Sequence, residues 1–393
     1  MHAAMSVQPL EPGWKDVLDR VLRPLGYAID DVSRLGPRVA ELSRAYNEGS
    51  AEGRKTRLPL EARIAFSFPR DVPKGAAAVR ELVREGTLEL PADRPLRLLY
   101  LDAGLGAMTW GIVRALGPSV RVEALLVDED AEALEAATAI VREHAAANPG
   151  SGLAVSTRVG TVAQYTDAKA DLAVLGQVLS ELDPRAAPAS RIETQVALVR
   201  RVLANADTVV IVEPALRDRT RHLHALRDAL IARDAEPRAY VHAPCLHSGP
   251  CPALAAEGDW CHEDLASVDL PEWVAPIARA AGLRWQGLTF SYLVLRKDPP
   301  SRAAVPERTS IRFRVTSDLL KSKGKTELFA CCESGARPRI RRLEREGAEL
   351  DDLERGDIVT ISSAEGAAPE APPIDERGRI AKHVAIDVPG RRH

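Results

Sequence analysis

The stretch RLLYLDAGLGAMTW, residues 97–110, decides the fold of this chain. An apolar run leads into Asp102, and two closely spaced glycines, Gly104 and Gly106, come before a segment with helical character. Glycine is required where a chain turns sharply from a strand into a helix and where a ligand lies against the backbone. Asp128 ends the next apolar run, where a carboxylate can accept hydrogen bonds from ribose hydroxyls. The pattern predicts a strand–loop–helix unit that holds a nucleoside.

The form of this loop distinguishes between nucleotides. A dinucleotide site has a third small residue at the position that Thr109 occupies, which counts against a nicotinamide-dependent oxidoreductase. The D-x-G-x-G form is typical of class I methyltransferases, whose cofactor S-adenosylmethionine carries no phosphates. The residues predicted to bind this cofactor are Asp102, Gly104, Gly106, Asp128 and Gln177. The alternative is a sheet in which the glycine-rich turn has no ligand.

Apolar segments alternate with amphipathic ones on both sides of the loop. The expected strands are Leu96–Asp102, Val122–Asp128, Leu153–Val159, Ala170–Gly176, Thr208–Glu213 and Leu288–Arg296. The expected helices are Thr109–Leu116, Asp130–Ala147, Arg191–Asn205 with Ser190 as N-cap, Leu216–Arg233 and Glu272–Ala281. Short apolar strands separated by helices favour a parallel sheet covered on both faces. The sequence therefore predicts an α/β, Rossmann-like fold with a doubly wound sheet.

The chain divides into three regions by composition and periodicity. We expect an N-terminal helical region over residues 1–90, followed by a methyltransferase-like domain over 91–300. Within that domain, residues 242–270 are rich in Pro, Gly and Cys and are expected to form an inserted ordered loop. A linker at 298–306 leads to a small β-rich domain over 305–393, which contains a low-complexity loop at 363–373.

Composition excludes several classes of protein. The formal net charge of −3 over 393 residues argues against a protein that coats nucleic acid through bulk positive charge. No run of 18 apolar residues occurs, so no transmembrane helix and no membrane partner are expected. The first residues lack the pattern of a secretory or organelle signal, so a cytoplasmic location is expected. The oligomeric state stays open, with a monomer as the expectation.

Polar residues follow two of the predicted strands at the edge where ligands bind in open α/β sheets. Gln177 and Glu181 come after the strand Ala170–Gly176, and Glu213 ends the strand Thr208–Glu213. These three residues are the catalytic candidates. For Glu181, a solvated helix residue is an equally good interpretation.

All five cysteines lie between Cys245 and Cys332, and an odd number in a reducing compartment makes disulfides an unsatisfactory explanation. Cys245, Cys251 and Cys261 have the spacing C-x5-C-x9-C, which is wider than the tight pairs of zinc ribbons. Wide spacing suits an inorganic cluster whose irons each need one thiolate. Zinc, with His247 or His262 as a substitute ligand, and a site without metal are the alternatives.

A fourth ligand must come from Cys331 or Cys332. Adjacent strand residues point to opposite faces, so only one of the two is expected to join the others. Such a site would staple the β-rich domain onto the sheet domain, since metal-binding energy is partly folding energy.

Two basic clusters are candidates for contact with RNA phosphates, and the alternative for each is a solvated surface. The first contains Arg217, Arg219, Arg221, His222, His224 and Arg227. The second contains Arg337, Arg339, Arg341, Arg342 and Arg345.

Several segments occur together in one order: LDAGLG, DLAVLGQVLSEL, VVIVEPAL, APCLHSGPCP with GDWCH, and FSYLVLRK. In this the chain resembles the methyltransferase-like proteins associated with the mitochondrial small ribosomal subunit and their bacterial relatives, from about Arg63 to Arg345. The resemblance implies a class I methyltransferase fold, binding of the small ribosomal subunit and its RNA during assembly or translation, and a four-cysteine iron–sulfur (4Fe–4S) cluster. It also favours Cys331 as the fourth ligand, because the family's cysteine stands four residues before a glycine, here Gly335. The function is then that of an S-adenosylmethionine-dependent methyltransferase, or of a non-catalytic assembly factor in which cofactor and metal are structural.

Overall fold

The computed structural model describes residues 10–52, 58–232, 236–265, 270–301, 310–363, 373–381 and 384–388. Most of the expected linker and of the low-complexity loop therefore lies outside the described residues, and so does the end of the cysteine-rich insertion. The described part of the N-terminal region is helical. Its elements are α1 (Gly13–Leu22), α2 (Val32–Glu52), α3 (Leu60–Ala62), a π-helical turn (Arg63–Ser67) and α4 (Phe68–Arg84).

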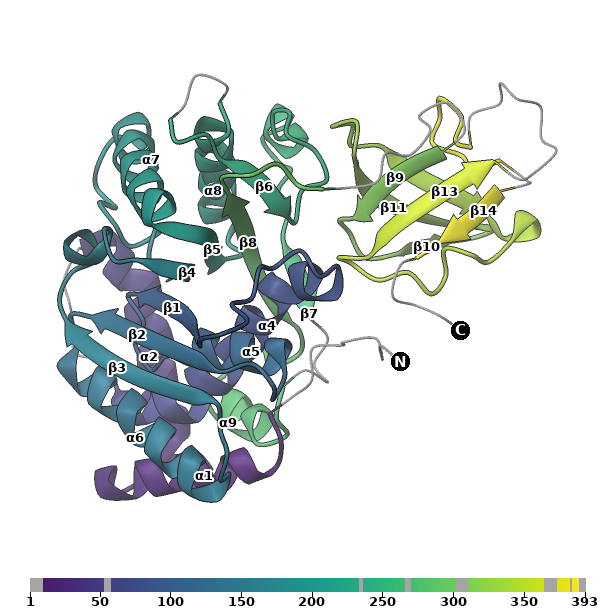
Figure 1. The fold of residues 1–393 in the computed structure, drawn as a ribbon. Helices are drawn as coiled ribbons and strands as arrows, with labels where there is room; N and C mark the ends of the chain where they lie inside the picture. Colours follow the sequence, from purple (N-terminus) through teal and green to yellow (C-terminus); the bar gives the residue numbers. More distant parts are fainter. Residues whose placement is uncertain are drawn as a thin grey trace.

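A mixed sheet forms the centre of the larger of two lobes (Figure 1). Its strands are β1 (Leu96–Leu101), β2 (Val122–Asp128), β3 (Leu153–Val159), β4 (Ala170–Gly176), β5 (Ala206–Pro214), β6 (Tyr240–Ala243), β7 (Glu263–Leu265) and β8 (Leu288–Arg296). The order is β3-β2-β1-β4-β5-β8-β6, and β7 also pairs with β8. Strands β1 to β5 are parallel, whereas β8 runs antiparallel to β5, β6 and β7.

Helices cover both faces of this sheet. They are α5 (Ala107–Leu116), α6 (Ala131–Ala147), α7 (Pro188–Asn205), α8 (Arg217–Leu230) and α9 (Val274–Ala280). Alternate residues of β1 enter different cores: Leu98 and Tyr100 pack with the N-terminal helices, α5, α6 and α9, whereas Leu99 and Leu101 pack with α7 and α8. The doubly wound sheet predicted from the apolar strands is confirmed.

Two local predictions were wrong. Helix α7 begins at Pro188, with Ala187 at the N-cap position, because proline fits the first turn of a helix, where its missing N–H is not needed. Ser190 therefore lies inside the helix rather than at its cap. The cysteine-rich insertion is also not a loop throughout, since β6 reaches into its start and β7 lies near its end, and both pair with β8.

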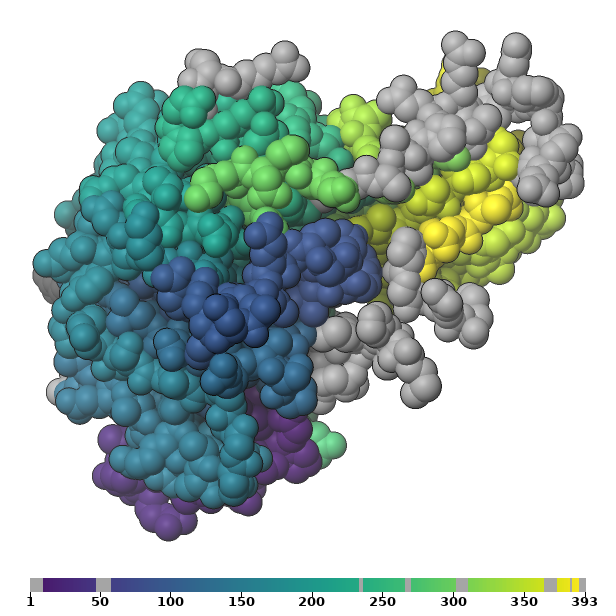
Figure 2. Space-filling view, viewed as in Figure 1, coloured from purple at the N-terminus to yellow at the C-terminus, as the bar shows by residue number. Residues whose placement is uncertain are grey.

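A second, antiparallel sheet follows. Its strands are β9 (Ser310–Val315), β10 (Leu320–Ser322), β11 (Lys325–Cys332), β12 (Arg339–Leu343), β13 (Ile358–Ser363) and β14 (Val384–Asp387). Their order is β10-β11-β9-β13-β14, and β12 pairs with β11. Phe313, Leu328 and Val359 lie in an apolar core that is separate from the cores of the main sheet. This β-rich domain packs against one side of the main domain (Figure 2). None of the helices in the described ranges is long and apolar enough to cross a membrane.

Candidate functional site

The glycine loop lies where the order of the strands reverses. Strand β1 lies between β2 and β4, so the connections on its two sides lead to opposite faces and leave a crevice at its carboxyl end. Gly104 and Gly106 have φ angles of 51° and 71°, in the left-handed region that glycine adopts without strain. Gly106 is the N-cap residue of α5, so the loop leads directly into the helix N-terminus.

Asp102 and Gln177 also adopt left-handed backbone conformations, with φ angles of 59° and 61°. They directly follow β1 and β4, and the register pairs Leu101 with Leu175, so the two residues lie at the same edge of adjacent strands. A left-handed conformation costs a side-chain-bearing residue about 1–3 kcal/mol and is concentrated at functional sites. Both residues were predicted to bind the cofactor, and their backbone strain is consistent with that role.

Asp128, at the end of β2, supports the glycine loop. One carboxylate oxygen accepts a hydrogen bond from the N–H of Gly104 at 2.6 Å, and the other accepts from the N–H of Asp130 at 2.8 Å. The side chain is buried, at 8% exposure. Sequence reasoning assigned this carboxylate to ribose hydroxyls; in the structure it fixes the loop, and its contact with a ribose stays a prediction.

Glu213 lies beneath the segment that follows β4. Its carboxylate accepts hydrogen bonds from the N–H groups of Leu179 and Ser180, at 2.9 and 3.1 Å. Burial raises the pKa of this carboxyl to about 7, although these hydrogen bonds act in the opposite direction. The buried Gln195 donates to the carbonyl of Leu179 at 2.7 Å, a contact that no sequence signal indicated. Glu213 therefore positions the segment that carries Gln177.

The other two catalytic candidates are more accessible. Gln177 is half-buried, and its backbone N–H donates to the carbonyl of Val212 at 2.6 Å. Glu181 is exposed. The sequence predicted the correct edge of the sheet. Only the tertiary structure shows that Glu213 is buried and supports the backbone, whereas Gln177 and Glu181 are more accessible.

Arg63 of the π-helical turn reaches this edge from the N-terminal region. Its Nη1 atom lies 2.6 Å from a carboxylate oxygen of Asp130, and its side chain is 12% exposed. Asp130 also caps α6 by accepting from the N–H groups of Glu132 and Ala133. Sequence reasoning missed Arg63, because it stands far from the loop in the chain and in no recognisable motif.

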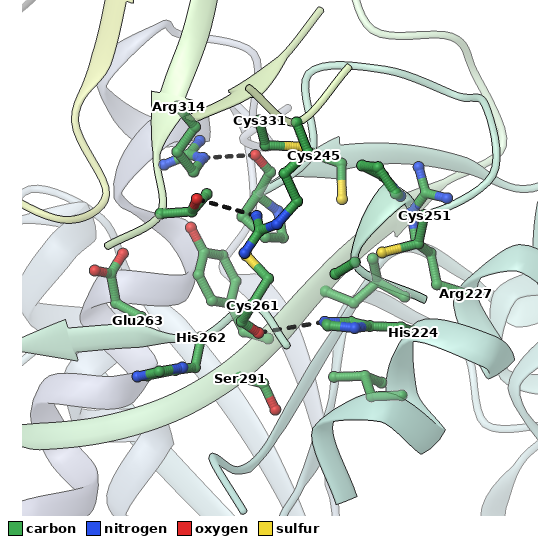
Figure 3. A pocket seen from close by; sticks show the side chains of 18 of the residues that line it. His224, Arg227, Cys245, Cys251, Cys261, His262, Glu263, Ser291, Arg314 and Cys331 are labelled. Carbon is green, nitrogen blue, oxygen red and sulfur yellow. Dashed lines mark hydrogen bonds between the residues drawn. The ribbon is translucent and has the colours of Figure 1, made fainter. Parts of the chain in front are cut away.

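A cavity at the junction of the two domains is lined by Cys245, Cys251, Cys261 and Cys331 (Figure 3). The first three come from the insertion, and Cys331 comes from β11. Cys332 is only 1% exposed and belongs to the apolar core of the β-rich domain. The alternation along the strand thus directs the two neighbouring cysteines to different surroundings, as expected.

The thiols differ in the groups that shift their pKa values. Burial, together with the neighbouring Cys245, raises the pKa of Cys251 to about 12. Burial and Cys245 likewise raise the pKa values of Cys261 and Cys331, which Arg337 lowers in part. Burial alone raises the pKa of Cys332 to about 12. The four cysteines of the cavity are therefore within electrostatic reach of one another, and Cys332 stands apart.

The cavity offers thiol and imidazole groups as metal ligands. Within the part of the chain that the structure describes, no three His, Cys, Asp or Glu side chains gather at the spacing that one ion requires. Zinc holds its sulfur ligands at about 2.3 Å, so its thiolates must nearly touch, whereas a cluster separates them by its own iron atoms. Of the two alternative histidine ligands, His247 lies 3.6 Å from Cys331, between Nε2 and Sγ, and His262 also lines the cavity.

Helix α8 holds in place the cysteine loop, the part of the insertion that carries Cys245, Cys251 and Cys261. Arg221 Nη1 donates to the carbonyls of Ala253, Ala256 and Asp259, at 3.0, 2.7 and 2.7 Å. One turn and more along the helix, the buried Arg227 donates to the carbonyls of the loop at His247 and Gly249, both at 2.8 Å.

Two further residues of α8 complete the support. Asp228 accepts from the N–H of Cys251, at 3.1 and 2.9 Å to its two oxygens. His224 Nε2 lies 3.2 Å from the carbonyl oxygen of Cys261. Arg221, His224 and Arg227 of the first basic cluster thus bind the cysteine loop. The prediction of an RNA-binding surface is wrong for these residues, because their donors face the protein.

The second basic cluster is also largely engaged within the protein. Arg337 forms a bidentate pair with Asp259 of the insertion, at 2.5 and 2.8 Å. Arg342 is 2% exposed and pairs with Glu349. Arg339 and Arg345 are exposed, so the surface available for phosphates is smaller than the sequence suggested.

Similar solved structures include methyltransferases and one other enzyme. A SAM-dependent methyltransferase from Agrobacterium tumefaciens is 12% identical, with a TM-score of 0.34, over 58% of this chain and 63% of that one. The plantazolicin methyltransferase BpumL, solved in complex with SAH, is 10% identical, with a TM-score of 0.32, over 70% of this chain and 99% of that one. The 4+2 cyclase SpnF is 14% identical, with a TM-score of 0.33, over 68% and 97%.

Comparison with curated proteins gave no match. A family model described as mitochondrial small ribosomal subunit Rsm22 matches residues 62–349, which include the glycine loop, the cysteine loop and Cys331. The chain has the doubly wound α/β sheet expected from its alternating strands and helices, and the strand next to β5 in that sheet runs antiparallel. With a match over most of its length, the chain belongs to the Rsm22 family.

Proposed function

We propose that this protein binds S-adenosylmethionine and acts on the small ribosomal subunit, in assembly or translation. The observation that carries the cofactor assignment is the pair of left-handed residues, Asp102 and Gln177, on adjacent strand ends beside a glycine loop. The partner is supported by the family description, which names the small ribosomal subunit of mitochondria.

The residues present suit the cofactor. Gly104 and Gly106 allow a ligand to approach the backbone, and Asp128 fixes the loop that holds them. Asp102 and Gln177 would contact the methionine part and the side of the cofactor that faces the acceptor. Bound S-adenosylmethionine supplies an activated methyl group, and the chain would contribute by orienting it and excluding water.

A non-catalytic assembly factor is the second candidate, and the position of Glu213 favours it. This carboxylate is buried and engaged by two backbone N–H groups, so it does not reach an acceptor as a base. Among the three catalytic candidates, Gln177 and Glu181 then remain; the amide of Gln177 is not a base, and Glu181 is exposed. In this version the cofactor stabilises a shape that the ribosome recognises.

We also propose that Cys245, Cys251, Cys261 and Cys331 hold a 4Fe–4S cluster, with zinc as the alternative. The support is the convergence of four thiols from two domains on one cavity. An iron–sulfur cluster supplies redox chemistry when bound, but buried between two domains its main effect would be to join them. Five free cysteines fit a reducing, cytoplasmic location.

Two measurements test the proposal. Calorimetry should detect S-adenosylmethionine binding, and labelled methyl transfer to small subunits from cells that lack the protein would support the enzyme. Binding without transfer to immature subunits would support the assembly factor, and no binding would contradict both versions. Anaerobic purification followed by iron, sulfide and zinc analysis should give four irons and four sulfides per chain. A colourless protein with one zinc would contradict the cluster.

A further inference from the structure

We infer that Arg63 recognises the α-carboxylate of the methionine part of S-adenosylmethionine. This inference rests on the proposed function and adds a residue to it, because neither the glycine-loop motif nor the comparisons assign a role to Arg63.

The argument begins with the position of the guanidinium. A Cβ atom placed on Gly104 would lie 2.9 Å from Arg63 Nη2, so the guanidinium lies next to the bare face of that glycine. The bare face of a glycine in such a loop is where a ligand approaches the backbone. Arg63 therefore lies at the ligand side of the loop rather than behind it, although it comes from the N-terminal region.

Arg63 is held in this position before any ligand arrives. Its Nη1 atom pairs with Asp130 at 2.6 Å, and Asp130 is itself fixed as the N-cap of α6. A guanidinium has five donors in a planar fork, so one edge can hold Asp130 while another binds a carboxylate of the ligand. Because the long side chain is already ordered in the free protein, binding a ligand costs less side-chain conformational entropy.

The charges around this site explain why a cation is needed. Arg63, Asp71, Asp102 and Glu181 all lie within electrostatic range of the Tyr46 hydroxyl, so these charges surround one site. Lys74 is paired with Asp71 at 2.7 Å. A ligand carboxylate placed among these acids without a partner would be repelled, whereas beside Arg63 it gains a charge-assisted hydrogen bond.

The rival interpretation is that Arg63 only connects the N-terminal region to α6. A cofactor analogue separates the two, because decarboxylated S-adenosylmethionine keeps the nucleoside, the sulfonium and the amine but lacks the carboxylate. A structural connection affects both ligands equally. A carboxylate contact affects S-adenosylmethionine alone.

The experiment is calorimetric titration of both ligands into the full-length wild type, Arg63→Met, Arg63→Lys and a matched control, Arg94→Met. Arg94 forms a comparable pair with Asp171, at 2.5 Å, at the amino end of β4 on the opposite edge of the sheet. The wild type should bind S-adenosylmethionine about 10- to 100-fold more tightly than the decarboxylated analogue, the range for a hydrogen bond to a charged group. Arg63→Met should remove this preference, Arg63→Lys should keep part of it, and Arg94→Met should keep all of it.

Three other outcomes would contradict the inference, and each leads to a different conclusion. If the wild type binds both ligands equally, Arg63 does not contact the carboxylate, although the proposed cofactor stands. If Arg63→Met weakens both ligands by the same factor, Arg63 is only a structural connection. If the wild type binds neither ligand, the proposed function fails and the inference fails with it. If Arg63→Met does not fold, Arg63→Lys decides the question, because an unchanged preference in that variant would contradict the inference.

Discussion

Arg314 of β9 forms an ion pair with Glu81 of α4, with 2.6 Å between the guanidinium nitrogen and the carboxylate oxygen, and each side chain is 5% exposed. The same guanidinium donates from Nε to the carbonyl of Pro244 at 2.7 Å and from Nη1 to the carbonyl of Gly356 at 2.6 Å. One side chain thus connects the N-terminal helices, the cysteine loop and the β-rich domain. The proximity of Glu81 and burial act oppositely on Arg314, and the net effect raises its pKa, so the pair stays charged.

Replacing Arg314 should therefore destabilise the whole molecule. Arg314→Met leaves Glu81 as a buried charge without this partner, and we expect a loss of about 3–5 kcal/mol in the free energy of unfolding. Denaturant titration measures this, with Arg355→Met as the control, since its partner Asp318 is largely exposed. The double variant with Glu81→Gln should recover part of the loss. A loss below about 1 kcal/mol would show that the junction does not depend on this pair.

The two adjacent cysteines should behave differently on substitution. Cys331→Ser should lower the iron and sulfide content of the anaerobically purified protein, because Cys331 lines the cavity. Cys332→Ser should keep that content and instead cost about 1–3 kcal/mol of stability, because it places a hydroxyl in the core of the β-rich domain. Elemental analysis of the monodisperse fraction compares the two. Equal metal content in both variants would contradict the assignment of Cys331.

Arg221 should matter for the cysteine loop rather than for RNA. Arg221→Met removes the donor from three carbonyls, and we expect a loss of about 1–3 kcal/mol together with reduced metal content. Arg217→Met on the same helix, at an exposed position, should change stability by less than about 0.5 kcal/mol. Filter binding to small-subunit RNA at several salt concentrations is the second measurement. A weaker salt dependence for Arg221→Met at unchanged stability would restore the phosphate-binding interpretation.

Asp128 should be required for the glycine loop even without ligand. Asp128→Ala leaves the N–H groups of Gly104 and Asp130 without their acceptor, at a cost of about 1–3 kcal/mol each. We expect a lower melting temperature and weaker S-adenosylmethionine binding. Asp167→Ala is the control, because this exposed carboxylate only pairs with Arg201. Normal stability with weakened binding would instead indicate a direct ribose contact alone.

Glu213 should make stability depend on pH. Its carboxyl has an ordinary pKa of 4.5 and a folded pKa of about 7, so between these values the folded protein holds a proton that the unfolded chain has released. Stability from this group therefore falls as pH rises from about 4.5 to 7, by roughly 3 kcal/mol in total. Glu213→Gln lacks this dependence, so its stability relative to wild type should rise over that range. A constant difference between pH 5 and pH 7 would contradict the raised pKa.

Much of the main sheet was predictable because its signals are local. The bounds of β2, β3, β4 and β8 were predicted to the residue. For β2, β4 and β8, which have a neighbour on each side, the signal is a run of apolar side chains, because an internal strand covered on both faces needs them. The glycine loop was equally clear, because a sharp turn before a helix restricts the residue types that fit. The short strands β6 and β7 were missed, since they form by pairing with β8 and carry no period of their own.

The amino-acid sequence by itself determined the doubly wound sheet, the loop at Gly104 and the set of cysteines, because these depend on neighbours in the chain. Only the tertiary structure decided which partner each charged or sulfur-containing side chain has. It placed Arg221 and Arg227 on the cysteine loop, separated Cys331 from Cys332, and brought Arg63 to Gly104. These contacts join segments far apart in sequence, and their energy depends on burial and donor geometry, which exist only after the helices and the two sheets have packed.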